Sequence, residues 1–335
     1  MRDEGRPQGL TPLRLKGLAL ESAVWQSPMA DCTDLPFRLL AREHGLRFAF
    51  LEMVSADSLL RRNRKTLEMM RTHPSDRPLG AQLMGGDPAM LAEAAALVEE
   101  MGFDLVDINM GCPAPKVAGG ARAGSALLRD PERAGCIIAA AARRLRRIPL
   151  TVKMRIGFDD PSGKEAVELA RRAEGAGACA VIVHGRTRAQ AYGGLADYAA
   201  IGRVKAAVRV PVVGNGDVFT GGDALRLAAE SGCDAVMIGR GGLGNPWLYR
   251  EIECALAGKA APARPSFEER RSTALRHMEL ERQVRGEERA VLYMRRIACW
   301  HFPGIPKAAA FRRAVCGAKD LAEVERLIQA LPESR

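Results

Sequence analysis

The chain has 335 residues, of which 47% are hydrophobic and 27% are charged. These proportions are those of an ordinary globular protein and exclude a disordered chain. The length allows one large domain, or a domain of about 250 residues with a smaller companion. The net charge of +10 is compatible with a polyanionic partner, because basic surfaces attract phosphate backbones, but many basic proteins bind no nucleic acid.

Targeting signals and cysteine spacing indicate the cellular compartment in which the protein works. The N-terminal segment contains acidic residues and no apolar run long enough for a signal peptide, and no later run approaches a membrane-spanning length. The eight cysteines show no CxxC pairs and no nearby histidine clusters, which argues against disulfides and zinc. We therefore expect a cytoplasmic monomer with no membrane anchor and no metal.

Along the chain, short apolar runs alternate with helical patterns, which is typical of βα units around a parallel sheet. The helices have clear signals: Asp87 and Pro88 predict the start of a helix over 89–102, and glycine ends a second one over 163–178. The predicted strands cover residues 23–29, 48–53, 79–84, 105–110, 150–155, 179–185, 210–216 and 235–240.

Eight βα units predict an α/β fold, a TIM (β/α)8 barrel over residues 22–250, with the active site at the C-terminal ends of the strands. Strand patterns cease after Trp247, and a linker over 256–266 begins three or four amphipathic helices. We expect these to form a small C-terminal helical domain over 251–335, which carries 16 Lys and Arg against 12 Asp and Glu, a balance of +4. Residues 1–21 are an N-terminal extension without an assigned role.

Polar residues gather where the predicted strands end, which is where function concentrates on this fold. A barrel core is normally filled by branched apolar side chains. If these polar groups had only a structural role, each would need its own hydrogen-bond partner in the core. They are Pro28 and Met29, Glu52, Gln82, Asp107 and Asn109, Lys153 and Arg155, His184, Asn215, and Gly239 with Arg240.

Glycine-rich turns over 214–217 and 239–244 end the last two strands, where TIM barrels commonly bind phosphate through backbone N–H groups. Lys153 can place positive charge beside an electron-rich heterocycle. Gln82 can pair with an imide edge through one donor and one acceptor. A flavin mononucleotide satisfies all three requirements.

Cys112 follows a buried strand, where a turn has no use for a thiol. Free cysteines are more often inert core residues, but Asn109, Pro113 and the glycine-rich loop over 118–124 give this one a functional context. A thiol is mainly protonated at neutral pH, so it can donate a proton to a carbanion-like carbon, and the loop could bring it over a substrate.

At this point an ordered set of motifs resembles the flavin-dependent tRNA-dihydrouridine synthases, in particular their bacterial B-type branch. The motifs span nearly the whole predicted barrel in the family's order, and the set is far more specific than any one member. They are SPMADCTDLPFR (27–38), GAQLMG (80–85), DINMGCPAPKV (107–117), GSALLRDP (124–131), TVKMRIGFDD (151–160), VHGRTRAQAYGG (183–194), PVVGNGDV (211–218) and DAVMIGRGGLGNPWL (234–248).

The resemblance implies a set of site residues. Cys112 takes the position of the proton donor, with Lys153 and His184 as further catalytic residues beside the flavin. Asn109, Arg155 and Arg186 would contact the target uracil or a neighbouring phosphate. The residues implied to hold FMN are Pro28, Met29, Ala30, Gln82, Lys153 and His184, with Asn215, Gly216, Asp217, Gly239 and Arg240 around its phosphate.

The resemblance also implies the reaction. NADPH would reduce FMN, a D-loop uridine of tRNA would enter the barrel mouth, hydride would pass to C6, and Cys112 would protonate C5. The helical tail would grip the tRNA elbow. The family tail often carries a basic residue and a histidine before a Trp-Tyr pair. This chain reads MRRIACWHFPGIP (294–306) instead, with Ile297 and His301 at the corresponding places; Arg296 keeps one charge.

Two alternatives remain open. Another FMN-dependent barrel oxidoreductase, acting on a small molecule such as a free pyrimidine or an enone, would share the strand-end residues and need no basic tail. A catalytically silent RNA-binding protein on the same barrel is the third interpretation. The joint presence of Cys112, Lys153 and His184 argues against it.

Overall fold

The computed structural model describes residues 10–114 and 122–332, and it contains a closed parallel barrel followed by a helical domain. The barrel strands are ordered around the ring so that the last, β11, pairs with β3, while β4 pairs with both β3 and β6. The strands are β3 (Val24–Gln26), β4 (Phe48–Phe50), β5 (Val54–Ser55), β6 (Leu79–Met84), β7 (Leu105–Met110), β8 (Leu150–Gly157), β9 (Ala180–Thr187), β10 (Val212–Asn215) and β11 (Ala235–Ile238).

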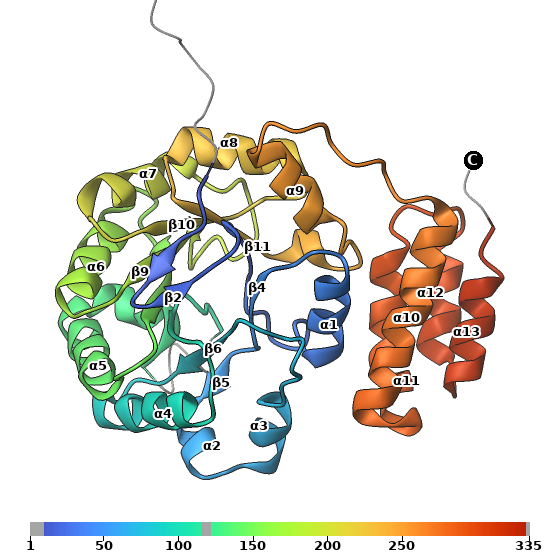
Figure 1. The fold of residues 1–335 in the computed structure, drawn as a ribbon, viewed down its shortest axis with the longest axis horizontal. Helices are drawn as coiled ribbons and strands as arrows, with labels where there is room; N and C mark the ends of the chain where they lie inside the picture. Colours follow the sequence, from blue (N-terminus) through green and yellow to red (C-terminus); the bar gives the residue numbers. More distant parts are fainter. Residues whose placement is uncertain (1–9, 115–121, 333–335) are drawn as a thin grey trace, which may run out of the picture.

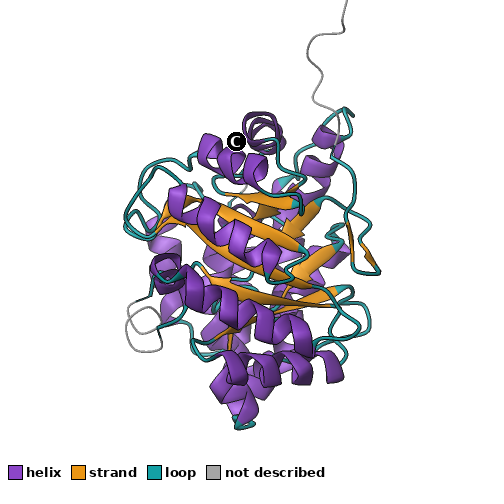
Figure 2. Cartoon of the chain, turned by 90° about the vertical axis from the view of Figure 1, so that its left-hand side faces the viewer, coloured by secondary structure: helices purple, strands orange, loops and turns teal. Residues whose placement is uncertain are grey.

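Helices surround the ring of strands on its outer face (Figure 1, Figure 2). The helix start predicted at Asp87 and Pro88 is confirmed, because the Asp87 side chain accepts a hydrogen bond from Met90 N at 2.8 Å. The barrel helices are α1 (Leu35–Glu43), α2 (Ala56–Leu60), α3 (Arg64–Met69), α4 (Pro88–Glu100), α5 (Pro131–Arg144), α6 (Lys164–Gly175), α7 (Tyr198–Ala207), α8 (Gly221–Ser231) and α9 (Leu248–Leu256), with 3-10 turns η2 (Gly124–Arg129) and η3 (Arg240–Gly242).

The predicted TIM barrel is therefore confirmed, with one irregularity in its second strand. β4 and β5 both pair with β6, so they act as one barrel strand interrupted at residues 51–53. Sequence inspection predicted strand through residue 53. In the interruption, Glu52 turns its carboxylate to the backbone N–H of Asp31 at 2.6 Å instead of continuing the ladder.

The N-terminal extension closes the end of the barrel opposite the strand C-termini. Its described part forms a hairpin, β1 (Arg14–Leu15) with β2 (Leu18–Ala19), which lies across the centre of the ring in Figure 1. Leu15 packs in one cluster with Trp25, Phe48 and Phe50, whose rings fill the barrel interior. That end is thus packed with apolar side chains, and the other end is left for polar groups.

The tail forms a separate hydrophobic cluster from four helices: α10 (Phe267–Arg285), α11 (Glu287–His301), α12 (Ala308–Gly317) and α13 (Leu321–Gln329). The boundary expected between residues 250 and 251 falls inside α9. Leu248 and Ile252 of that helix belong to the barrel cluster, because the apolar face of α9 packs on the barrel. The extended linker that separates the two clusters lies between α9 and α10.

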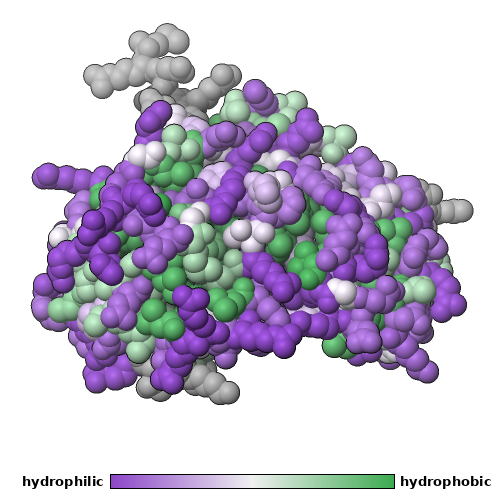
Figure 3. All heavy atoms as spheres, turned by 60° about the horizontal axis from the view of Figure 1, so that its bottom comes forward, coloured by the Kyte–Doolittle hydropathy of each residue, from purple (hydrophilic) through white to green (hydrophobic). Residues whose placement is uncertain are grey.

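The surface is mainly polar. Figure 3, in which the side of the molecule carrying α2, α3 and α4 comes forward, shows hydrophilic residues over most of this face with apolar residues in separate patches. Among residues 10–114 and 122–332, no helix has the length and apolar composition that a membrane crossing needs.

Candidate active site

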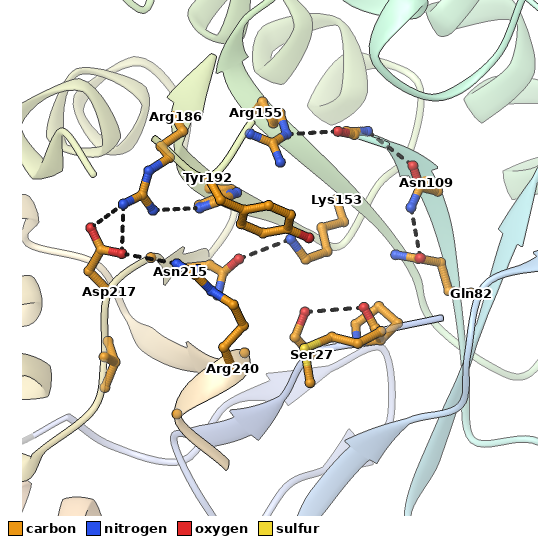
Figure 4. A pocket seen from close by; sticks show the side chains of 18 of the residues that line it. Ser27, Gln82, Asn109, Lys153, Arg155, Arg186, Tyr192, Asn215, Asp217 and Arg240 are labelled. Carbon is orange, nitrogen blue, oxygen red and sulfur yellow. Dashed lines mark hydrogen bonds and ion pairs between the residues drawn. The ribbon is translucent and has the colours of Figure 1, made fainter. Parts of the chain in front are cut away.

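A cavity opens at the C-terminal ends of the barrel strands, with about 790 Å³ of empty space when its open mouth is included. The cavity is lined by every predicted site residue except Ala30, which is exposed, and Cys112, whose neighbour Gly111 lines it. Polar side chains from β6, β7, β8, β9 and β10 converge on this space (Figure 4).

The strand period explains why these side chains meet. Successive residues of a strand point to opposite faces, so residues two apart share the barrel interior. Asn109 lies opposite Lys153 in the ladder, and His184 lies opposite both Arg155 and Asn215. Polar residues at these register positions form one continuous ring above the apolar layers.

A chain of amide and carboxylate groups crosses three strands at the base of the cavity. Asn109 Nδ2 donates to Gln82 Oε1 at 2.8 Å, and Gln82 Nε2 donates to Asp107 Oδ2 at 2.7 Å. Thr151 Oγ1 donates to the other Asp107 oxygen at 2.7 Å. Burial raises the pKa of Asp107 to about 6, while the bonds from Thr151 and Gln82 oppose this shift. The network fixes the orientation of the Gln82 amide.

Asn109 also shapes the turn that carries Cys112. Its Oδ1 accepts hydrogen bonds from the backbone N–H groups of Gly111, at 3.1 Å, and Cys112, at 2.9 Å. Arg155 holds the same turn from the opposite side, since its Nε donates to Gly111 O at 2.9 Å. Asn109, expected to contact substrate, thus has both side-chain polar atoms engaged in positioning Cys112 and Gln82. Residues 118–121 of the glycine-rich loop expected to move over the site lie outside the described residues.

Lys153 supplies positive charge to the cavity floor. Its Nζ donates to Asn215 Oδ1 at 3.0 Å, and Asn215 Nδ2 in turn donates to Met237 O at 2.8 Å. Burial, with the charge of Arg155 nearby, lowers the pKa of Lys153 to about 8, while Asp107 opposes the shift. A bound anion beside the ammonium would favour its charged form.

His184 lies among cations. Burial lowers its pKa well below the ordinary value, and the charges of Lys153 and Arg155 act in the same direction. Its imidazole is therefore neutral at pH 7. Neutral imidazole can accept or donate one hydrogen bond at each nitrogen, and Arg186 Nη1 approaches its Nε2 at 3.4 Å.

Arg186 and Asp217 form an ion pair that holds the turn after β10 in place. Arg186 Nη2 lies 2.8 and 2.6 Å from the two Asp217 oxygens, and it also donates to Gly194 O at 2.6 Å. The Arg186 side chain is 3% exposed. Both were expected to contact ligands directly, Arg186 the substrate and Asp217 the cofactor phosphate. Their side chains pair with each other, so their charges order the turn beside the cavity.

The glycines of the last two strands fit a ligand that approaches the backbone closely. A Cβ placed on Gly239 would meet only the Met29 sulfur, at 3.9 Å, among the described residues, so a side chain there would extend into the cavity. Gly216 is required for a different reason: its φ of +138° is a conformation that L side chains rarely adopt, and a Cβ there would lie 2.7 Å from Ala196 Cβ. The residues present therefore fit a flat heterocycle above Lys153 and Gln82, with an anionic group at the Gly216 and Gly239 turns.

Comparison with known proteins then decides the family. The dihydrouridine synthase family model matches residues 25–334. The chain belongs to this family. The tRNA-dihydrouridine synthase B of Pseudomonas aeruginosa is 40% identical over 304 residues, 90% of each chain. A probable tRNA-dihydrouridine synthase of Rickettsia bellii is 39% identical over 305 residues, 90% of this chain and 92% of its own.

Solved structures resemble this dihydrouridine synthase family member in fold alone. A 6-hydroxypseudooxynicotine amine oxidase from Pseudomonas geniculata matches with a TM-score of 0.60 and 13% identity, over 89% of this chain and 56% of its own. A histamine dehydrogenase from a Rhizobium species matches with a TM-score of 0.56 and 13% identity, over 82% of this chain and 51% of its own. The chain spans about half the length of these two structures. The family match confirms the resemblance and the flavin-dependent oxidoreductase class that it implied.

Sequence reasoning assigned no role to two aromatic residues of this dihydrouridine synthase site. Tyr192 and Phe219 line the cavity while remaining 59% and 48% exposed, so they form its rim. The Arg240 guanidinium lies 4.7 Å from the Tyr192 ring centre and 5.9 Å from that of Phe219. Tyr192 lies in a motif that resembled the family, but neither residue follows a strand end, and nothing in the local pattern marks Phe219.

The departures in the tail are interior residues. Ile297 is 2% exposed in the helical cluster, and His301 is 1% exposed with its Nε2 at 3.1 Å from His277 Nδ1. Arg296, the charge that remains, donates to Asp31 O and stacks over Trp300. It therefore links the helical domain to the loop that follows β3.

Proposed function

We propose that this dihydrouridine synthase reduces the 5,6 double bond of a D-loop uridine in tRNA, using FMN and NADPH, with Cys112 as the proton donor. The observation that carries the proposal is the joint presence, on one cavity, of a cationic floor at Lys153 and a thiol-bearing turn held by Asn109. The relatives named tRNA-dihydrouridine synthase supply the substrate class.

Residues of this chain would hold the flavin as follows. Lys153 and the fixed Gln82 amide would bind the polar edge of the ring, and the backbone of the Gly216 and Gly239 turns would bind the phosphate. Pro28 and Met29 line the opposite wall, and His184 would contact the flavin as a neutral donor. When bound, the flavin supplies the hydride that reaches C6 of the uracil.

The proton for C5 would come from Cys112 Sγ. Asn109 and Arg155 both bind the Gly111–Cys112 peptide group, so they limit the positions that the thiol can take. Proton transfer depends on such placement, because donor and acceptor must come within hydrogen-bond distance. After transfer, the thiolate would regain its proton from water. One hydride and one proton add across the double bond, which balances the reaction.

The rim supports an RNA substrate. Tyr192 and Phe219 offer exposed aromatic faces next to Arg240, and unstacked bases bind to such faces while the cation attracts the backbone. A uridine must leave its stack to reach the cavity, which costs least in a loop. A flat apolar substrate alone would not need an exposed cation beside the aromatic rim.

The helical domain would extend this grip. Arg64 and Lys65 of α3 line a groove together with Arg289 and Tyr293 of α11, between the barrel and the helical domain. Glu68 in the same groove pairs with Arg64 and Arg289, so a phosphate would have to compete with this carboxylate for both cations. Phosphates bind such positions without sequence readout. We therefore propose that α10–α13 form the tRNA-binding domain.

The proposal also covers the electron donor, the cellular compartment and the oligomeric state. NADPH would donate electrons to the flavin through the same open mouth. All eight cysteines are free thiols, which supports a reducing cytoplasm. We also propose that the protein is a monomer.

Two measurements test the function. Mass spectrometric mapping of tRNA from cells lacking this protein should show loss of dihydrouridine at one or more D-loop positions, and an unchanged map would contradict the proposal. Purified protein with NADPH should reduce unmodified tRNA much faster than free uracil. Turnover confined to the free base would favour the small-molecule oxidoreductase instead.

A further inference from the structure

A buried polar cluster lies where the helical domain meets the barrel, apart from the active site. Asp34 caps α1 on the barrel side, and His277 and Glu281 lie one turn apart on α10, which packs against α1 (Figure 1). The three residues are 6%, 1% and 0% exposed. The proposed reaction uses none of them, so the cluster needs another explanation.

Two polar atoms of this cluster have no hydrogen-bond partner among the described residues. They are Nε2 of His277 and Oε1 of Glu281. His277 Nδ1 is already paired with His301 Nε2 at 3.1 Å, which leaves Nε2 as the ring nitrogen available to a ligand. A buried polar atom without a partner costs about 1–3 kcal/mol, so a bound group that satisfies both atoms would be stabilising.

The charges of the cluster do not balance. Arg285 Nη2 lies 2.5 Å from Asp34 Oδ2, and its Nε lies 2.7 Å from Glu281 Oε2. One guanidinium thus faces two carboxylates. An additional cation between Asp34 and Glu281 would balance the second carboxylate.

We propose that Asp34, His277 and Glu281 bind one divalent first-row transition-metal ion. One ligand atom from each residue lies within 4.8 Å of the other two. Imidazole nitrogen with carboxylate oxygens is a donor set that Zn²⁺ and Mn²⁺ accept, and the nitrogen disfavours Ca²⁺ and Mg²⁺. Coordination at about 2.0–2.2 Å places ligand atoms roughly 3–3.5 Å apart, so the three side chains would adjust to this spacing around the ion.

The surroundings support this ligand role. A hydrogen bond at the non-coordinating nitrogen fixes the ring orientation of a metal-bound imidazole, and His301 provides such a bond to His277. Arg285 would hold the two carboxylates in the same way through their other oxygens. Bound metal would join α10 to the N-terminus of α1, which follows the Pro28–Ala30 segment of the active site. The sequence predicted no metal, because Asp34 and His277 are distant along the chain.

The test uses the full-length, flavin-loaded protein without a histidine tag. Protein incubated separately with excess Zn²⁺ and Mn²⁺ is desalted, and bound metal is measured by inductively coupled plasma mass spectrometry. We expect about one equivalent of at least one of these ions in the wild type. Glu281→Gln, which keeps the side-chain volume, and His277→Gln should each lower the content about tenfold or more. Glu279→Gln, on the exposed face of the same helix, should leave it unchanged.

Wild-type protein that retains neither ion would overturn the proposal. Equal metal content in wild type and Glu281→Gln would also overturn it, because the ion would lie elsewhere. Should His277→Gln fail to fold, Glu281→Gln decides the matter together with thermal unfolding. The ion that binds should raise the Tm of the wild type and leave that of Glu281→Gln unchanged.

Discussion

Replacing Asn109 with alanine tests whether the position of Cys112 limits the reaction. The substitution removes the amide that accepts from the backbone N–H groups of Gly111 and Cys112 and donates to Gln82. The flavin-holding residues Lys153 and Asn215 keep their own hydrogen bond. We therefore expect Asn109→Ala to bind FMN and to accept electrons from NADPH nearly as the wild type does, while forming dihydrouridine slowly.

The magnitude follows from the two turn hydrogen bonds. Each contributes about 1 kcal/mol net, so together they favour the turn that presents Cys112 by about 2 kcal/mol. Since about 1.4 kcal/mol corresponds to a factor of ten, the productive turn becomes about 30-fold less populated when both bonds are lost. The bond to Gln82 adds a smaller effect on the flavin edge.

Single-turnover kinetics separate the two steps. Flavin absorbance follows reduction by NADPH, and reoxidation by unmodified tRNA is followed on the prereduced enzyme. The expected result is normal reduction with reoxidation slowed about 10- to 100-fold. Asn109→Asp, which keeps an acceptor for both N–H groups, should recover part of the rate. A normal reoxidation rate in Asn109→Ala would refute the positioning argument, and loss of FMN would assign Asn109 to the cofactor.

Three further changes probe other parts of the molecule. In flavin-free protein, the affinity for FMN should weaken as pH rises above about 8, because Lys153, whose pKa is lowered to about 8, loses its positive charge there. Lys153→Met should abolish this pH dependence of the affinity, measured by fluorescence titration. An equal pH dependence in both proteins would contradict the role of Lys153. Arg186→Lys cannot reproduce the paired contact with Asp217, so the turn after β10 should become less ordered and FMN should bind about tenfold more weakly. An unchanged Kd for FMN would mean that the turn keeps its conformation without this ion pair. Leu15→Ala should lower the free energy of unfolding, measured in urea, by about 2–4 kcal/mol, because Leu15 is 2% exposed at the closed end of the barrel. The affinity for FMN should not change. A loss of stability under about 1 kcal/mol would argue against the hairpin as part of the core.

The barrel and the composition of its site follow from local pattern. The strand over Leu105–Met110 was predicted from its apolar run, and the polar positions Asp107 and Asn109 within it already have the two-residue spacing that places both inside the barrel. The glycine-rich turns after β10 and β11 were predicted from their residue composition alone. These features depend on neighbouring residues, which is why the sequence is enough to find them.

Partners across the ring are harder to predict. Nothing near Arg186 in the sequence marks Asp217 as the group that neutralises it, since the contact depends on how two loops meet. The hairpin at Leu15 was likewise unassigned, because its role is set by Trp25, Phe48 and Phe50 in the closed barrel. Residue identity indicates what a side chain can do, and tertiary packing decides which neighbour it acts on.

Cys112→Ala tests the proposed reaction most directly. The variant should bind FMN and be reduced by NADPH at the wild-type rate, since Cys112 does not line the flavin cavity. Dihydrouridine formation on unmodified tRNA, measured by mass spectrometry, should fall by about 100-fold or more, the usual contribution of a general acid. Wild-type yield and rate from Cys112→Ala would contradict the assignment of this thiol as the proton donor.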